Sequence, residues 1–270
     1  MGLGDLFKSK TERAMQKALN PTKDNITRVK ALDHLEEQAK AGDDQCLQSL
    51  IKCFHITVKK DQQEQSLAPY DDEAEKKGLI ERLAGFDDPR RVIKHLRKEL
   101  ATPPWLTPGR RDGVVFMIEL LGELAEAASE SEEAAQSLLL DELVLALGSY
   151  EPEESYRSPE RKVELVRAVG RHDAAKAAEA IVPFLKDVDE TVRFAAADSL
   201  AVAGNDTLGD ALAEVILDDE SLRVREKAAA VLAELQCSIK GHPRRKELEA
   251  AFGKDVAVDK QGVVRRRKSQ

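Results

Sequence analysis

One phrase of sequence occurs twice in the last third of this chain, and the two copies are separated by a constant 32 residues. Each copy opens on an acidic turn, continues with a valine-arginine pair and runs into an alanine-rich segment. The matching positions are Val192/Val224, Arg193/Arg225, Ala196/Ala228, Ala197/Ala229 and Leu200/Leu232. A fixed period of this length is typical of proteins built from stacked structural repeats. The spacing therefore constrains the fold more than any other feature of the sequence.

Weaker copies of the phrase precede these two, and three of the copies end at a glycine. Arg111 stands eleven residues before Gly122, as Arg193 stands eleven residues before Gly204, and a copy without the arginine ends at Gly170. A glycine after the last apolar residue is typical of a helix that ends in a left-handed residue. We therefore expect the three glycines to lie in the turns between paired helices.

The acidic turn, the valine-arginine pair and the alanine-rich helix together resemble the HEAT repeat of the bacterial phycobilisome lyase-like family. The resemblance implies an all-α fold, namely a right-handed α-solenoid of about five HEAT-like helical hairpins. It also implies a module that holds a partner. In HEAT-like repeats the matching acid and arginine bond to one another or to the turn of the next repeat. The resemblance thus implies a structural ladder made by Asp187, Arg193, Asp219 and Arg225.

Composition agrees with a layered helical fold. Aromatic residues make up 4% of the chain, and the thin layers between paired helices need few of them. The second helix of each hairpin is expected at residues 138–147, 174–186 and 208–217, with Pro183 bending the middle one. A short β-hairpin is expected at residues 256–264, where apolar residues alternate around a Gly-containing turn.

Breaks in the helical pattern divide the chain into four parts. We expect an N-terminal helix in residues 1–23, because an Asn-Pro pair ends the first helical pattern. The HEAT-like α-solenoid is expected to span residues 24–238, and a C-terminal helix with a β-hairpin cap to span 239–264. Residues 265–270 read as a mobile basic tail.

Charge is distributed unevenly along the chain. The formal net charge is −8, yet residues 239–270 hold ten Lys/Arg and four Asp/Glu, and residues 119–160 hold twelve acids and a single base. An acidic body argues against general nucleic-acid binding, which needs a basic groove. Two roles for the basic tail stay open: Arg265, Arg266 and Arg267 contact a protein partner, or they contact nucleic-acid phosphates.

The sequence indicates no catalytic, cofactor-binding or metal-binding residues. It contains no phosphate-binding loop, no Gly-x-Ser-x-Gly elbow and no Cys/His pair at catalytic spacing. The iron-dependent deoxyhypusine hydroxylases share the HEAT-like fold and bind metal through His-Glu pairs, but none of the five histidines here precedes a glutamate. The three cysteines, Cys46, Cys53 and Cys237, are expected to be small buried residues in a reducing compartment.

No apolar run is long enough to span a membrane, and the N-terminus does not resemble a secretory signal. We therefore expect a cytoplasmic protein without catalytic activity that serves as a protein–protein interaction scaffold or adaptor. Binding is expected on the concave row of second helices, tuned by the acidic segment 119–160. The alternatives are nucleic-acid binding through the basic tail and an accessory role of the lyase type.

Overall fold

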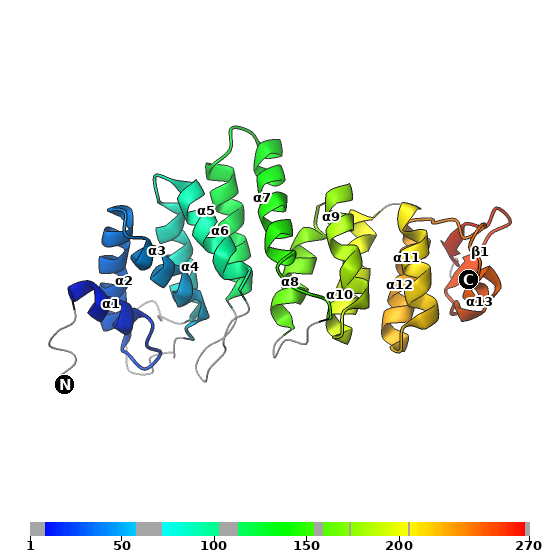
Figure 1. The fold of residues 1–270 in the computed structure, drawn as a ribbon, viewed down its shortest axis with the longest axis horizontal. Helices are drawn as coiled ribbons and strands as arrows, with labels where there is room; N and C mark the ends of the chain where they lie inside the picture. Colours follow the sequence, from blue (N-terminus) through cyan, green and yellow to red (C-terminus); the bar gives the residue numbers. More distant parts are fainter. Residues whose placement is uncertain are drawn as a thin grey trace. The chain divides into compact units, whose positions relative to one another are not determined.

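The computed structural model describes residues 9–57, 72–102, 113–153, 159–172, 174–204 and 206–267. These residues fold almost entirely as helices, with one two-stranded antiparallel sheet near the C-terminus (Figure 1). The all-α prediction with a C-terminal β-hairpin is thereby confirmed. The helices gather into two compact units, residues 1–142 and 143–270. The predicted division into four parts did not anticipate this boundary, which falls inside a helix.

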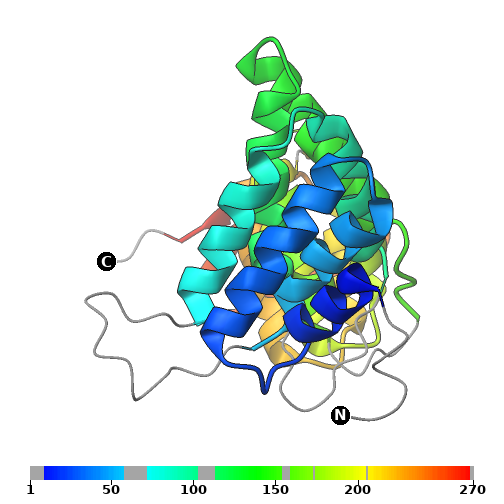
Figure 2. The same cartoon turned by 90° about the vertical axis from the view of Figure 1, so that its left-hand side faces the viewer.

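The N-terminal unit consists of successive helices joined by short turns. In chain order these are α1 (Lys10–Ala18), α2 (Asn25–Lys40), α3 (Asp44–Lys52), the 3₁₀ turn η2 (Cys53–His55), α4 (Asp72–Ala84), α5 (Pro89–Leu100), α6 (Val114–Ala127) and most of α7 (Glu132–Leu147). Within it α1 packs on α2, α2 on α3, α3 on α5, and α4 and α5 on α6. Figure 2 faces this unit, with α1 in dark blue beside α2.

Polar residues fix where these helices begin. Ser9 and Glu12 form a capping box at the start of α1, in which each side chain bonds the other residue's backbone N–H. Asp24 and Asp43 accept backbone N–H bonds at the starts of α2 and α3. Such caps satisfy donors that have no partner inside the helix. The helix predicted within residues 1–23 therefore begins at Lys10 among the described residues.

A buried ionic cluster ties the N-terminal unit together. Arg28 of α2 donates to both carboxylate oxygens of Glu75 on α4 and to the backbone carbonyls of Ala18 and Asn20. Both charged side chains are almost fully buried. Next to them, Lys76 donates to backbone carbonyls of the η2 turn. Buried charges of this kind are tolerated because each has several partners.

The C-terminal unit contains the two strong copies of the repeat. Its elements after α7 are α8 (Glu160–Val169), α9 (Ala175–Ile181), the 3₁₀ helix η3 (Val182–Lys186), α10 (Glu190–Ala203), η4 (Asp206–Leu208), α11 (Gly209–Asp218), α12 (Leu222–Glu234), α13 (Arg245–Ala251), β1 (Val256–Val258) and β2 (Val264–Arg266). Helix α10 packs between α8 and α12, while α11 packs on α12 and α13. The residues that recur every 32 positions are the core: Ala196, Ala197, Leu200, Ala228, Ala229 and Leu232 are all buried.

The glycine prediction was wrong in its mechanism. Gly122 lies inside α6, which continues to Ala127. Gly170 and Gly204 do end α8 and α10, but their φ angles are −69° and −89°, not left-handed. A side chain at either position is excluded by contact: a Cβ on Gly170 falls 2.3 Å from the Cβ of Ser199. Close helix packing, not backbone handedness, therefore requires Gly170. Arg111 lies outside the described residues.

Two local predictions hold. The predicted helix 174–186 changes at Pro183 from α9 into the 3₁₀ helix η3, because proline cannot donate the backbone hydrogen bond that would continue the α-helix. The β-hairpin pairs Val258 with Val264, and its turn contains Gly262 at φ +88°. The hairpin packs on α12. An isolated hairpin is marginal in water, so this contact stabilises it.

Candidate interaction surfaces

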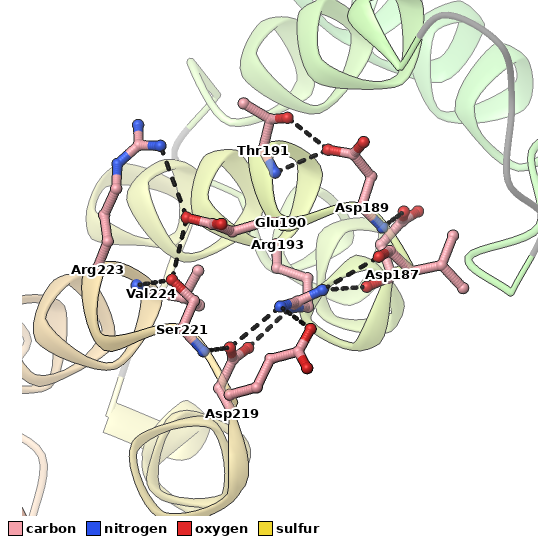
Figure 3. A network of polar contacts seen from close by, with 11 residues as sticks. Asp187, Asp189, Glu190, Thr191, Arg193, Asp219, Ser221, Arg223 and Val224 are labelled. Carbon is pink, nitrogen blue, oxygen red and sulfur yellow. Dashed lines mark hydrogen bonds and ion pairs between the residues drawn. The ribbon is translucent and has the colours of Figure 1, made fainter.

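Two ionic rungs join consecutive repeats of the C-terminal unit, and Figure 3 shows the one between Arg193 and Asp219. Arg193 of α10 donates from Nε to Asp219 at 2.8 Å and from Nη2 to the other carboxylate oxygen at 3.2 Å. Its Nη1 atom bonds the backbone carbonyl of Asp187 at 3.0 Å. One repeat earlier, Lys162 of α8 donates to the carboxylate of Asp187 at 2.5 Å. Each rung therefore runs from a helix to the turn that opens the next repeat.

The acid of each rung also shapes its own turn. Asp187 accepts the backbone N–H of Asp189, and Asp219 accepts that of Ser221, in both cases two residues further along. This local bond is the Asx turn that favours aspartate before a helix. The two acids thus fix the entry to α10 and α12 while they hold the preceding helix. One residue type serves both local and tertiary structure.

Burial sets the electrostatics of the rungs. Removal from water raises the pKa of Asp187 above its usual value, even though Lys162 lies within hydrogen-bond distance. The hydrogen bond with Asp219 raises the pKa of Arg193, which stays charged. Lys162 and Asp187 are both almost completely buried. The side chains of both rungs are therefore largely buried, although Asp187, Arg193 and Asp219 also line a cavity described below.

Two of the residues predicted for the ladder behave differently from expectation. Asp187 meets Arg193 through its backbone carbonyl, and its carboxylate goes to Lys162. The side chain of Arg225 makes no hydrogen bond or ion pair with the described residues, and its Nε atom is buried. The reason is visible in the sequence: 32 residues after Asp219 stands Ala251, which has no carboxylate. The series of rungs ends there.

Lys162 was not predicted from the sequence as a member of the ladder, because the copies of the repeat were aligned on their glycines. Gly170 and Gly204 are 34 residues apart, whereas Lys162 and Arg193 are 31 apart. The signal that finds it is the distance to the acid, since Lys162 precedes Asp187 by 25 residues and Arg193 precedes Asp219 by 26. Because α8 is shorter than α10, its cation lies closer to its glycine.

The predicted partner-binding arginines are engaged within the chain. Arg265 bonds Asp259 at 2.7 Å and Gln236 at 3.1 Å, and Arg266 pairs with Glu234 of α12. Both lie in β2, so the expected mobile tail does not begin at residue 265. Arg267 is exposed, and residues 268–270 lie outside the described part of the chain. These contacts reduce the charge that Arg265 and Arg266 offer to a polyanion.

Two separate cavities border the second helices of the C-terminal unit, where a binding surface was expected, and we call the surface from one to the other the groove. One end is a cavity of about 320 Å³ lined mostly by apolar residues of α9, η3 and η4, among them Ala178, Pro183 and Leu208. The other end is a cavity of about 420 Å³ lined by residues of η3 and α11, among them Glu214 and Asp218, and by the rung residues Asp187, Arg193 and Asp219. The 3₁₀ helix η3 borders both cavities, the first through Val182 and Pro183 and the second through Leu185 and Lys186.

A second exposed face lies on α4 and α6 of the N-terminal unit. Glu81, Glu119, Glu123 and Glu126 gather there, and burial together with the other three carboxylates raises the pKa of Glu123. Among the described residues none of the four has a cationic partner. Acids also dominated the predicted segment 119–160, so the sequence identified the location of this charge but not the contribution of Glu81.

The described residues contain no group of three or more His, Cys, Asp or Glu side chains placed to bind a metal ion. None of their helices is long and apolar enough to cross a bilayer. The three cysteines are buried thiols that form no disulfide, and burial raises the pKa of the Cys46 thiol to about 12. A thiol with such a pKa is a poor nucleophile at neutral pH.

Comparison with known proteins identifies the repeat. A family model described as HEAT repeats matches residues 154–233, which covers the two strong copies. Comparison with curated proteins gives no match. Residues 154–233 thus match HEAT repeats, whereas neither the lyase-like subfamily nor a bacterial source is established.

Several solved structures show a distant likeness. Human deoxyhypusine hydroxylase in complex with glycerol is 16% identical, covers 90% of this chain and 94% of its own, and has a TM-score of 0.31. A computationally designed armadillo repeat protein for modular peptide recognition is 19% identical, with coverage of 83% and 99% and a TM-score of 0.36. A designed armadillo repeat protein in complex with the peptide (KR)4 is 17% identical, with coverage of 84% and 100% and a TM-score of 0.35. Likeness at this level assigns neither activity nor ligand.

Proposed function

We propose that this HEAT-repeat chain is a non-catalytic scaffold or adaptor that binds another protein along the groove between α9–η3 and α11. The observation that carries the proposal is the groove itself. Its apolar end near Pro183 and its charged end near Glu214 offer both parts of a typical interface, an apolar contact and a polar rim.

The HEAT repeats support the same conclusion. Stacked repeats display long exposed helix faces, and their interior here is occupied by alanine, leucine and ionic rungs. The buried ion pairs among the described residues hold helices together, as the rungs and the Arg28–Glu75 pair do. A binding role uses the outward faces and leaves this interior unchanged. We place the protein in the cytoplasm because its three cysteines are buried thiols that form no disulfide, which is typical of proteins in a reducing compartment.

Site-specific photo-crosslinking tests the proposal. A photoreactive residue is placed at Glu179, which lines the groove, at Asp210, which is exposed on α11, and at Glu226, which is exposed on α12. We expect the first two positions to crosslink the same protein in cells and Glu226 to serve as the matched control. Equal crosslinking at all three positions, or turnover of a substrate by the purified protein, contradicts the proposal.

A further inference from the structure

A basic cavity lies between α1 and α2 of the N-terminal unit, the two helices in the darkest blues of Figure 2. Its volume is about 410 Å³. Six polar side chains line it, and all six are cationic or uncharged: Lys10, Arg13, Lys17, Thr27, Lys30 and His34. No acid belongs to the described lining. The two cavities of the C-terminal unit differ in this respect, since acidic residues line both.

Helical spacing brings these side chains together. Lys10, Arg13 and Lys17 follow one another at intervals of three and four residues along α1, and Thr27, Lys30 and His34 do the same along α2. Residues at these intervals share one face of a helix. Each helix therefore presents a polar row, and the two rows border the cavity from opposite sides.

Small residues give the cavity its depth. Ala14 and Ala31 are buried and line the same cavity, one on each helix. Alanine carries too little side chain to fill the space between two helices. The long cationic side chains thus reach over a recess and not over a flat surface.

The cations of this cavity are not used by the fold. Among the described residues Lys10, Lys17 and Lys30 make no ion pair, and Arg13 only donates to the backbone carbonyl of Ser9 at 3.4 Å. The Nδ1 atom of His34 is buried and makes no hydrogen bond, although the carboxylate of Glu37 lies 3.8 Å away, and Nε2 lies 3.4 Å from the hydroxyl of Thr11. Like charges that gather around a recess repel one another. An anion that enters the recess relieves this repulsion.

We propose that the α1–α2 cavity binds a compact ligand that carries two or more adjacent phosphate groups. Phosphate oxygens point in several directions and accept bonds from donors on both helices at once. Lysine and arginine are the side chains that recognise phosphate most often. Four cations together match the charge of a di- or triphosphate better than that of a single carboxylate.

The surroundings favour a compact anion over an extended one. Glu12, Asp24, Asp33 and Glu37 lie on the same two helices or their caps, outside the lining of the cavity. A phosphate chain that continued past the cavity in both directions would meet these carboxylates. Duplex DNA and anionic membranes are therefore poorer ligands than a short polyphosphate. The site lies outside the groove proposed for a protein partner and does not depend on it.

Calorimetric titration of the full chain with sodium tripolyphosphate tests the proposal. We expect Arg13→Ala and Lys30→Ala each to weaken binding about tenfold, which is the loss of one good charge-assisted contact. The matched control is Lys246→Ala, which removes an equally exposed cation from α13. It should leave the affinity within about twofold, since a distant charge is screened. Thermal unfolding of each variant verifies that α1 still packs on α2.

Magnetic resonance of the histidine rings supplies a second readout. The ring signals of His34 should shift on addition of tripolyphosphate, and those of His242, in the C-terminal unit, should not. Titrations with a doubly phosphorylated serine peptide distinguish a free ligand from one carried by a protein, and binding of either agrees with the proposal.

Three results would overturn the phosphate site. These are absence of binding at millimolar tripolyphosphate, equal weakening by Lys246→Ala, and tighter binding of a short DNA duplex that is lost in the same variants. Crosslinking at Glu179 reports on the protein-binding groove alone. The two proposals therefore fail separately.

Discussion

The two units join their helices with ion pairs of different reach. In the C-terminal unit a cation pairs with an acid 25 or 26 residues further on, in the turn that opens the next repeat. In the N-terminal unit Arg28 and Arg82 pair across 46 to 49 residues, directly between α2 and α4. The first pattern follows the sequence period and the second does not. A contact that recurs in every repeat keeps the same residue types at the same spacing in the sequence. The HEAT-repeat match is accordingly confined to residues 154–233, where the ion pairs recur in this way.

The largest expected effect comes from the buried rung of the C-terminal unit. Asp187→Ala leaves the buried ammonium of Lys162 without its carboxylate, so the free energy of unfolding should fall by about 3–5 kcal/mol. The matched change in the N-terminal unit is Asp33→Ala. Asp33 is 56% exposed where it pairs with Arg82, and its loss should cost less than about 1 kcal/mol. Urea unfolding measures both.

A double variant sharpens this comparison. Replacing both partners, Lys162→Met with Asp187→Asn, removes the unpaired charge and keeps an acceptor for the N–H of Asp189. Most of the lost stability should return. If Asp187→Ala and Asp33→Ala lower the free energy of unfolding by the same amount, the ion pairs of the two units do not differ in the way that their burial predicts.

Glycines provide the next comparison. Gly170→Ala forces α8 away from α10, because the new Cβ would lie 2.3 Å from that of Ser199, and should lower stability by about 1–3 kcal/mol. Gly122→Ala places its Cβ in open space inside α6, so it should raise stability by about 0.5–1 kcal/mol. Thermal denaturation gives the sign of each change. Two changes of the same sign would contradict the packing of α8 against α10.

The smallest expected effects are pH-dependent and concern the N-terminal unit. Burial and neighbouring acids raise the pKa of Glu123 above 4.5, so its folded form holds a proton more tightly and stability is lost as pH rises through this range. Glu123→Gln should therefore stabilise the protein at pH 7, by less than about 1 kcal/mol. Well below pH 4.5 the difference from the wild type should vanish.

Glu36 is the control of opposite sign. Burial raises its pKa, but Lys40 and Arg82 outweigh burial and lower it below 4.5. Its contribution to stability is present above pH 4.5 and is lost as pH falls through the folded pKa. Glu36→Gln should therefore destabilise the protein at pH 7 and have no effect at low pH. Urea unfolding at several pH values measures both variants, and equal signs would contradict the charge pattern on α2, α4 and α6.

Much of the fold could be predicted from the sequence, because the core residues recur at a fixed spacing. Ala196, Ala197 and Leu200 with their partners 32 residues later form one interior, and Pro183 marks the change from α-helix to 3₁₀ helix. The prediction that each glycine lies in a turn failed at Gly122, because the sequence alone does not reveal whether a glycine ends a helix or lies within it. Contacts that depend on which helices become neighbours, such as Arg28 with Glu75, leave no local signal.

The candidate sites were less accessible to sequence reasoning. The groove depends on how η3 meets α11, and the basic cavity depends on α1 packing along α2 so that two unremarkable polar rows face the same space. Arg265 and Arg266 were a reasonable choice from charge alone, yet strand pairing directs them to Asp259 and Glu234. Charge in a sequence predicts a surface only where tertiary neighbours do not neutralise it.

The forward direction of the rungs has a consequence for engineering this scaffold. Each cation needs only the turn that opens the following module, so a second copy of residues 190–221 inserted after Ser221 would restore the Arg193–Asp219 rung at both junctions. The rungs would then continue through each added module, although the exposed pairs of Glu190 with Arg223 and of Asp198 with Lys227 would form only at the last junction. A module added after α12 would lack its rung, because Ala251 offers no carboxylate to Arg225.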